Sequence, residues 1–189
     1  VITNDVFTNL TGGPLAVEYD IIPLSEDGCS GDPVTVTLTV NPEPASDDVD
    51  LAICSMDNLN IDLQSLITNG VPSDFEWTLT LANPALAPFL EVNDQTWNPT
   101  IHGMGTSSTL TQKFTNLSSV PLVVIFTVEP TAVTGSCEGE SFEIEVTIRQ
   151  NINAIINPDA TEICTGSMLD IDGLASQGVA PYIFNWSIA

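Results

Sequence analysis

The sequence predicts an all-β protein built from antiparallel, immunoglobulin-like β-sandwich domains in tandem. Three observations support this class: segments in which apolar and polar residues alternate, a composition that favours strands, and an internal repeat of domain size. Thr and Val are abundant, whereas Lys and Arg, which commonly fill the surfaces of helices, number only 2 together. The composition therefore argues against a helical protein.

Alternating residues mark the expected strands. Residues 34–40 read Val-Thr-Val-Thr-Leu-Thr-Val, so every apolar side chain falls on one face of a strand. The segments 75–81, 142–148 and 182–188 alternate in the same way, and we expect further strands at 59–66, 109–117 and 122–128 and loops at 83–88 and 102–105. About seven short strands per hundred residues predict a two-sheet sandwich.

An internal repeat with a period of about 108 residues runs through the whole chain. Its period is too long for a solenoid unit and matches the usual size of an independent domain. The matched segments are Phe7–Leu10 with Phe114–Leu117, Pro14–Val17 with Pro121–Val124, Cys29 with Cys137, Val34–Val40 with Phe142–Ile148, Cys54 with Cys164, Gly70-Val71 with Gly178-Val179, and Phe75–Trp77 with Phe184–Trp186. The repeat predicts separate domains joined in a line.

The phase of the repeat divides the chain into three parts. We expect residues 1–41 to be the C-terminal part of one repeat, 42–150 a complete repeat, and 151–189 the N-terminal part of the next. The N-terminus has neither a basic start nor a hydrophobic signal region, so we expect the chain to be cut from a longer protein. Residues 41–45, Asn-Pro-Glu-Pro-Ala, form a Pro-rich linker of the semi-rigid, extended type.

The charge balance excludes several partners. The chain has 25 acidic and 2 basic residues, a net charge of −23. Nucleic acid is not an expected partner because phosphate binding requires a cationic surface, and an anionic membrane surface is disfavoured for the same reason. The longest apolar run, around residues 122–128, is shorter than the roughly 18 residues of a membrane span, so we expect no membrane insertion.

Four motifs in the central repeat carry a family resemblance: Ala52–Ser55, Phe75–Thr78, Phe126–Thr131 and Gly135–Gly139. Their order resembles the PKD-like repeats of giant secreted surface proteins of Bacteroidetes, including gliding-motility adhesins. This resemblance implies a β-sandwich array that is exported by a dedicated outer-membrane system and displayed on the cell surface. It also implies neighbouring repeats and the secretion or motility machinery as partners, and it brings no catalytic residues or cofactor. One departure is Ser55–Asp57, Ser-Met-Asp, where the family more often has Ser-Gly, so the turn there can differ.

The four cysteines, two per period, fit an oxidising exterior better than a cytosol. The complete repeat contains Cys54 and Cys137, which are the candidates for a disulfide. Such a bond would stabilise the fold by about 4 kcal/mol on the chain-entropy account. In a simple immunoglobulin-like topology, however, these positions lie at opposite ends of the sandwich, which would leave two free thiols. Both alternatives stay open, and no C-x-x-C pair indicates zinc.

Two further groups of residues could carry chemistry, and each has a simpler explanation. His102, with Ser107 or Ser108 nearby, could act as a general base, but no nucleophile elbow or second His accompanies it, so we expect no catalytic residues and no enzyme. The segment 47–50, Asp-Asp-Val-Asp, could hold Ca²⁺ through oxygen ligands, although it does not follow the order of an EF-hand loop. A solvated acidic linker explains it as well, and we expect no bound metal or cofactor.

Three segments, starting at Asn9, Asn116 and Asn185, fit the N-glycosylation pattern. The first two lie in matched repeat segments, so strand-end geometry is an alternative explanation for their recurrence. Trp97 could stack on a sugar if it were exposed, although packing is the simpler expectation.

The function that these observations favour is a structural stalk repeat of a large secreted cell-surface adhesin, involved in adhesion or gliding motility. The alternative is a carbohydrate- or protein-binding sandwich module, in which an aromatic patch near Trp97 or the loop through Met104 contacts the ligand. The sequence does not identify that ligand.

Overall fold

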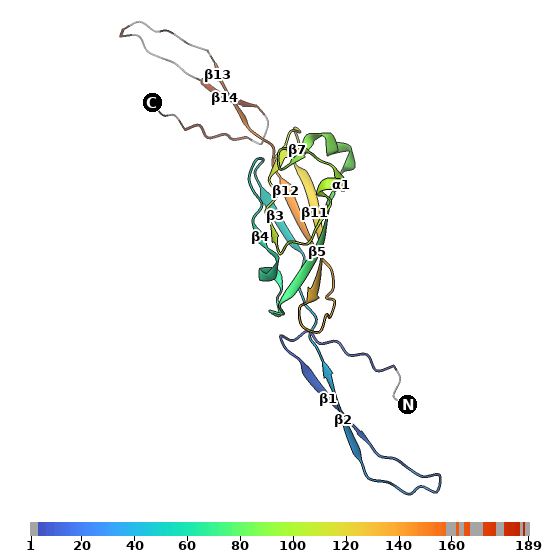
Figure 1. The fold of residues 1–189 in the computed structure, drawn as a ribbon. Helices are drawn as coiled ribbons and strands as arrows, with labels where there is room; N and C mark the ends of the chain where they lie inside the picture. Colours follow the sequence, from blue (N-terminus) through green and yellow to red (C-terminus); the bar gives the residue numbers. More distant parts are fainter. Residues whose placement is uncertain are drawn as a thin grey trace.

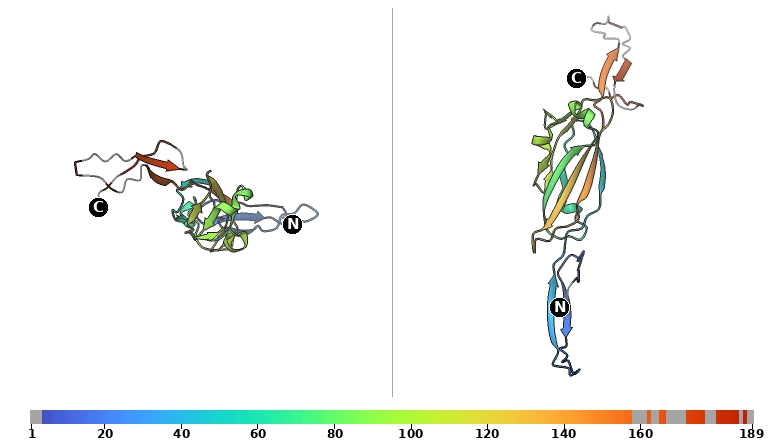
Figure 2. Two further views of the ribbon diagram at one scale, coloured as in Figure 1. Left: turned by 90° about the horizontal axis from the view of Figure 1, so that it is seen from above. Right: turned by 90° about the vertical axis from the view of Figure 1, so that its right-hand side faces the viewer.

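The computed structural model describes residues 4–157, 162, 165–166, 172–176, 180–185 and 187. A central β-sandwich lies between two hairpins that extend from its opposite ends (Figure 1). The hairpin on the N-terminal side consists of β1 (Leu15–Ile21) and β2 (Val34–Val40), and the other of β13 (Asn153–Asn157) and β14 (Asp172–Ser176). The two further views in Figure 2 show the same elongated arrangement.

One layer of the sandwich is a five-stranded sheet. Its strands lie in the order β3 (Val49–Ile53), β12 (Phe142–Ile148), β11 (Leu122–Ala132), β5 (Ser73–Leu81) and β8 (Met104–Gly105). Neighbouring strands are antiparallel except β3 and β12, which are parallel. The sandwich class is as predicted, with this one parallel pair as a departure from a purely antiparallel sheet.

Shorter strands and helical turns make up the other layer. The strands are β10 (Phe114–Asn116), β6 (Leu90–Val92) and β7 (Gln95–Thr96) in one sheet, and the pair β4 (Ile61–Asp62) and β9 (Thr109–Leu110). The 3-10 helices are η1 (Leu63–Leu66) and η2 (Pro84–Phe89), and α1 spans Pro99–His102. The strands predicted at 59–66 and 109–117 are thus shorter than expected, because η1 replaces most of the first and a break divides the second.

The core joins both layers into one apolar cluster. The inward residues of β5, β11 and β12 alternate with exposed or half-exposed ones, as the sequence predicted. The Trp77 ring is buried and packs edge-on against Phe126, with ring centroids 5.5 Å apart. Fully buried residues from the second layer include Leu63, Leu90 and Phe114.

The C-terminal segment departs from the predicted pattern. Residues 153–157 pair with 172–176 in a hairpin that the sequence did not predict, and the described residues 182–185 are not in a strand. The matched segment of the central repeat, β5, pairs with β11 along its whole length. Cys164 and Trp186 lie outside the described residues.

No helix in the described part of the chain is both long and apolar enough to cross a membrane.

Candidate functional site

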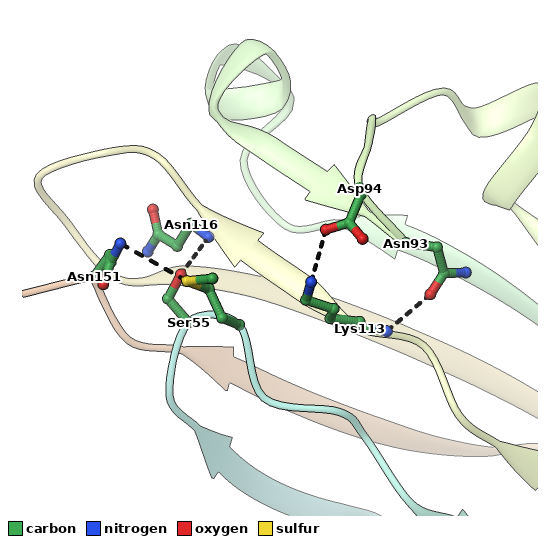
Figure 3. A network of polar contacts seen from close by, with 7 residues as sticks. Ser55, Asn93, Asp94, Lys113, Asn116 and Asn151 are labelled. Carbon is green, nitrogen blue, oxygen red and sulfur yellow. Dashed lines mark hydrogen bonds and ion pairs between the residues drawn. The ribbon is translucent and has the colours of Figure 1, made fainter.

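Two buried asparagines hold identical loops, one at each matched position of the repeat. The Asn116 side-chain amide donates to the carbonyls of Val120 and Ile148, both at 2.9 Å. Its Oδ1 accepts from the Ser118 N–H at 2.8 Å and from the Ser118 hydroxyl at 2.7 Å. Figure 3 shows the Asn116 main-chain N–H donating to the hydroxyl of Ser55, at 2.9 Å. This one side chain therefore ties the end of β10 to the end of β12.

The loop at Asn9 repeats this pattern. Its amide donates to the carbonyls of Gly13 and Val40 at 2.9 and 2.8 Å, and its Oδ1 accepts from the Thr11 N–H and hydroxyl at 3.0 and 2.6 Å. Both asparagines are buried, at 2% and 0% exposure, and each amide nitrogen donates two hydrogen bonds. The glycosylation pattern at these two positions is thus explained by strand-end geometry, since neither amide is accessible for attachment.

The β1–β2 hairpin carries an apolar face that lies in solvent. Its register pairs apolar residues on one face, namely Leu15 with Val40, Val17 with Leu38, Tyr19 with Val36, and Ile21 with Val34. Five of these side chains, Leu15, Ile21, Val34, Val36 and Leu38, are between 43 and 59% exposed. In the β11–β12 hairpin the register is the same, and the five residues at the matched positions are at most 2% exposed. The apolar face is therefore buried in the β11–β12 hairpin and exposed in the matching β1–β2 hairpin.

A groove of about 330 Å³ lies beside β8, at the edge of the five-stranded sheet. Its lining includes Trp77, Met104, Gly105 and Thr127. Met104 is 73% exposed, and Gly105 pairs with Trp77 across the β5–β8 register. A Cβ on Gly105 would lie 2.2 Å from Cζ2 of Trp77, so only glycine lets β8 approach the indole this closely. The Nε1 of Trp77 is buried without a hydrogen-bond partner among the described residues.

The surroundings of this groove are acidic. Glu76 and Glu129 lie directly opposite each other on β5 and β11, and both line a second, polar hollow together with Glu138. Like charges in directly opposite positions destabilise a strand pair, and here they give this face a negative potential. An anionic ligand is therefore disfavoured at this edge. The ion pair between Lys113 and Asp94, with 2.7 Å between Nζ and Oδ1, lies elsewhere, in the β6–β10 region (Figure 3).

The acidic segment at 47–50 has a structural role in this fold. The Asp48 carboxylate accepts a hydrogen bond from the Glu143 N–H at 2.7 Å, next to the start of β12. Within the described residues no group of three or more His, Cys, Asp or Glu side chains could hold a metal ion.

The side chains of His102 and Ser107 each form a hydrogen bond with the main chain. The Nδ1 of His102 accepts from the Asn98 N–H at 3.2 Å, and the hydroxyl of Ser107 donates to the Thr109 carbonyl at 2.9 Å. The imidazole also stacks on the Trp97 ring, with centroids 5.8 Å apart. Trp97 is half-buried and packs against the core, which was the simpler of the two expectations for this residue.

The disulfide considered for Cys54 and Cys137 is absent, because both are free cysteines. Ile53 lies beside Ile148 in the parallel β3–β12 pair, so Cys54 is just beyond that end of the sheet. Cys137 precedes Phe142, at the other end of β12. The six residue steps along β12 correspond to about 20 Å, whereas bonded cysteines have Cα atoms within about 7 Å. The two cysteines therefore lie at opposite ends of the sandwich, which was the argument against a disulfide in the sequence analysis.

The turn after Cys54 contains a residue with a strained backbone. In the sequence, only the departure of Ser55–Asp57 from the family pattern indicated this turn. Met56 has φ of +74°, and the Asp57 N–H donates to the Cys54 carbonyl to close the turn. Glycine adopts this conformation without strain, and Gly166, which occupies the matched position 110 residues later, has φ of +85°. The turn thus forms without glycine, but Met56 adopts its backbone conformation only with strain.

The fold and its paired asparagine loops define an all-β sandwich module of the immunoglobulin-like class. The family profile of the PKD-like domain matches residues 1–44 and 51–152 of the chain, and the chain belongs to this family. No curated protein matches the sequence.

Proposed function

We propose that the chain is a structural stalk segment of a large secreted adhesin, displayed at the bacterial cell surface, attached to the outer membrane and serving adhesion or gliding motility. The observation that carries this proposal is the recurrence of one hairpin and one asparagine loop at a constant spacing along an elongated molecule. On this proposal residues 1–41 are the C-terminal part of one repeat, 42–150 a complete repeat and 151–189 the start of the next. Neighbouring repeats of the same polypeptide are then its first partners.

The junction between the first two units supports a stiff connection. The Asn69 side chain donates to the carbonyl of Leu10 at 3.2 Å and to that of Glu43 at 2.7 Å, so it bridges the N-terminal unit and the linker. Pro42 and Pro44 are buried, and the Glu43 N–H donates to the Asn9 carbonyl at 3.0 Å. A linker held on both sides in this way limits bending between the units. Such stiffness is what a stalk requires.

The charge of the chain suits the same role. A net charge of −23 makes successive units repel each other, which favours an extended, soluble array over a collapsed one. This repulsion weakens as salt shortens the Debye length to about 8 Å near physiological ionic strength.

Small-angle scattering on chains with one, two and three copies of residues 42–150, joined by the native linker, tests the proposal. Each copy should add roughly 30–40 Å to the maximum dimension, since strands rise about 3.3 Å per residue. Replacing Asn69 by Ala should increase bending at each junction, whereas the exposed Asn60→Ala serves as the matched control. Compact particles whose dimension barely grows with copy number would reject the stalk.

A carbohydrate- or protein-binding module is the second candidate, and the groove beside β8 is the observation that favours it. The groove includes Met104, in the loop that the sequence singled out, and its apolar floor and acidic rim suit a neutral or cationic ligand. Saturation-transfer NMR with neutral oligosaccharides tests the carbohydrate case. Binding that Met104→Glu abolishes and Thr80→Glu leaves intact would favour it over the stalk.

A further inference from the structure

We propose that the groove beside β8 and the acidic hollow next to it together bind one extended, basic segment of another polypeptide. The inference rests on the protein-binding candidate, whose partner it defines, and it goes beyond the stalk role. All the residues that line this site belong to the central sandwich, within residues 74–141.

Three hollows beside β5 form one continuous trough. The groove of about 330 Å³ and the polar hollow of about 460 Å³ share Glu76 and Glu129 as walls. A third hollow, of about 400 Å³, shares Glu76 and Thr106 with the groove, and Thr131 with the polar hollow. Glu76 thus lies where all three meet. The trough therefore presents an apolar part and an acidic part to the same ligand.

Glu76 and Glu129 carry like charges that no basic side chain of this chain compensates. They lie directly opposite each other on β5 and β11, an arrangement that destabilises a strand pair. The sequence contains only two Lys and Arg residues. Lys113 is paired with Asp94, and Arg149 follows the end of β12 that is remote from Glu129. An ammonium or guanidinium group that relieves the repulsion must therefore come from a partner.

The strand edge beside the trough has main-chain groups without a strand neighbour. β8 pairs with β5 only at Trp77 and Thr78, so the N-terminal half of β5 has no neighbouring strand on this side among the described residues. The Leu79 N–H donates to the Gly103 carbonyl, so the odd-numbered residues of β5 direct their main-chain groups toward β8. Phe75 therefore presents its N–H and carbonyl at the open edge, where an extended segment can pair with them.

A buried hydrogen-bond donor lies at the wall of the groove. Trp77 is 7% exposed, and its Nε1 has no hydrogen-bond partner among the described residues. The ring edge that carries this nitrogen faces Gly105, since Cζ2 and Cε2 are the atoms that a Cβ at Gly105 would meet first. A buried donor without a partner is costly, and a carbonyl of the bound segment would supply the acceptor. Met104, which is 73% exposed in the same wall, offers its side chain to an apolar residue of the segment.

These features together favour a polypeptide over a free cation. The carboxylate pair recognises a basic side chain, the groove accepts an apolar one, and the edge of β5 pairs with a main chain. An extended segment that contains Lys or Arg beside apolar residues meets all three requirements. A metal ion meets only the first, and no group of three or more His, Cys, Asp or Glu side chains in the described part of the chain could hold one.

Titration of the full chain with the acetylated, amidated peptide Lys-Val-Lys-Val-Lys-Val, followed by calorimetry and ¹H–¹⁵N NMR, tests the inference. The amide signal of Phe75 and the indole N–H signal of Trp77 should shift, and added salt should weaken the binding. The Glu76→Gln, Glu129→Gln double variant should bind about tenfold more weakly or worse, because both charge-assisted contacts are lost.

A matched control removes the same charge elsewhere. Glu18→Gln combined with Glu26→Gln changes two exposed residues of the N-terminal hairpin and should leave the affinity unchanged. The peptide with Gln in place of Lys should bind the wild-type chain about tenfold more weakly or worse. Circular dichroism confirms that both double variants keep the fold.

Three results would overturn the inference. The first is an equal loss of affinity in the two double variants, since a net charge of −23 alone would then account for the binding. The second is spermine that binds as tightly as the peptide, because the strand edge would then contribute nothing. The third is a basic peptide that does not bind at all. If neutral oligosaccharides still bind in that case and Met104→Glu abolishes their binding, the binding module stands and only its basic partner is rejected.

Discussion

The side-chain amide of Asn116 donates to the main-chain carbonyl of Ile148 at 2.9 Å, a contact that joins the layer of β10 to the layer of β12. We predict that Asn116→Asp lowers the free energy of unfolding by about 3 kcal/mol, because a buried carboxyl would face two carbonyl oxygens without an amide donor. Chemical denaturation followed by Trp fluorescence measures the change.

Asn60→Asp is the matched control, since Asn60 is exposed and should change stability by no more than about 0.5 kcal/mol. Equal effects of the two substitutions would show that the Asn116 loop does not hold the layers together. The same substitution at Asn9 should disorder the end of the N-terminal hairpin while leaving the unfolding of the central sandwich unchanged.

The long alternating strands were predictable from the sequence, because burial of one face imposes a period of two on β5, β11 and β12. The short strands of the other layer were not, since two or three residues carry no measurable period. β4 and β9 contribute two residues each, and their pairing joins residues 49 and 47 positions apart, Ile61 with Leu110 and Asp62 with Thr109.

The functional features were likewise only partly predictable from the sequence. The repeat pointed to Asn9 and Asn116, and strand-end geometry was already one explanation for them, but the four hydrogen bonds of each loop needed coordinates. The apolar face of β1–β2 looked like a buried strand face in the sequence. Whether such a face is covered depends on which other segments lie against it, and an alternating pattern does not contain that information.

A second prediction concerns the strained turn at Met56. We expect Met56→Gly to stabilise the fold by about 1 kcal/mol, because glycine adopts the φ of +74° without the steric cost of a Cβ. The Met56 side chain is 54% exposed, so its removal sacrifices little packing. Thermal and denaturant unfolding measure the gain. Met104→Gly replaces another exposed methionine outside the positive-φ region and should not stabilise.

A third prediction concerns the contact between β8 and the Trp77 indole. Gly105→Ala should destabilise the sandwich by about 2 kcal/mol, because the new Cβ would overlap the ring and force either β8 or the ring to move. The near-ultraviolet circular dichroism of the tryptophans should change with it. Thr106→Ala, at the exposed next position, should leave both stability and spectrum unaltered. An unchanged spectrum in Gly105→Ala would show that β8 does not sit against the ring.

The last prediction concerns the thiols. Because Cys54 and Cys137 are free and lie at opposite ends of β12, a reducing agent should leave the unfolding midpoint of the central sandwich unchanged. A bridge between them would instead contribute about 4 kcal/mol that reduction removes.

Cys54 is exposed and Cys137 half-buried, so a thiol reagent added to the folded chain should label Cys54 faster, which peptide mass spectrometry resolves by site. Cys54→Ser should abolish the fast label at this site, leave the label at the exposed Cys29, and shift stability by no more than about 0.5 kcal/mol. Thiols that resist labelling in the unfolded, unreduced chain would contradict the free state and restore the bridge.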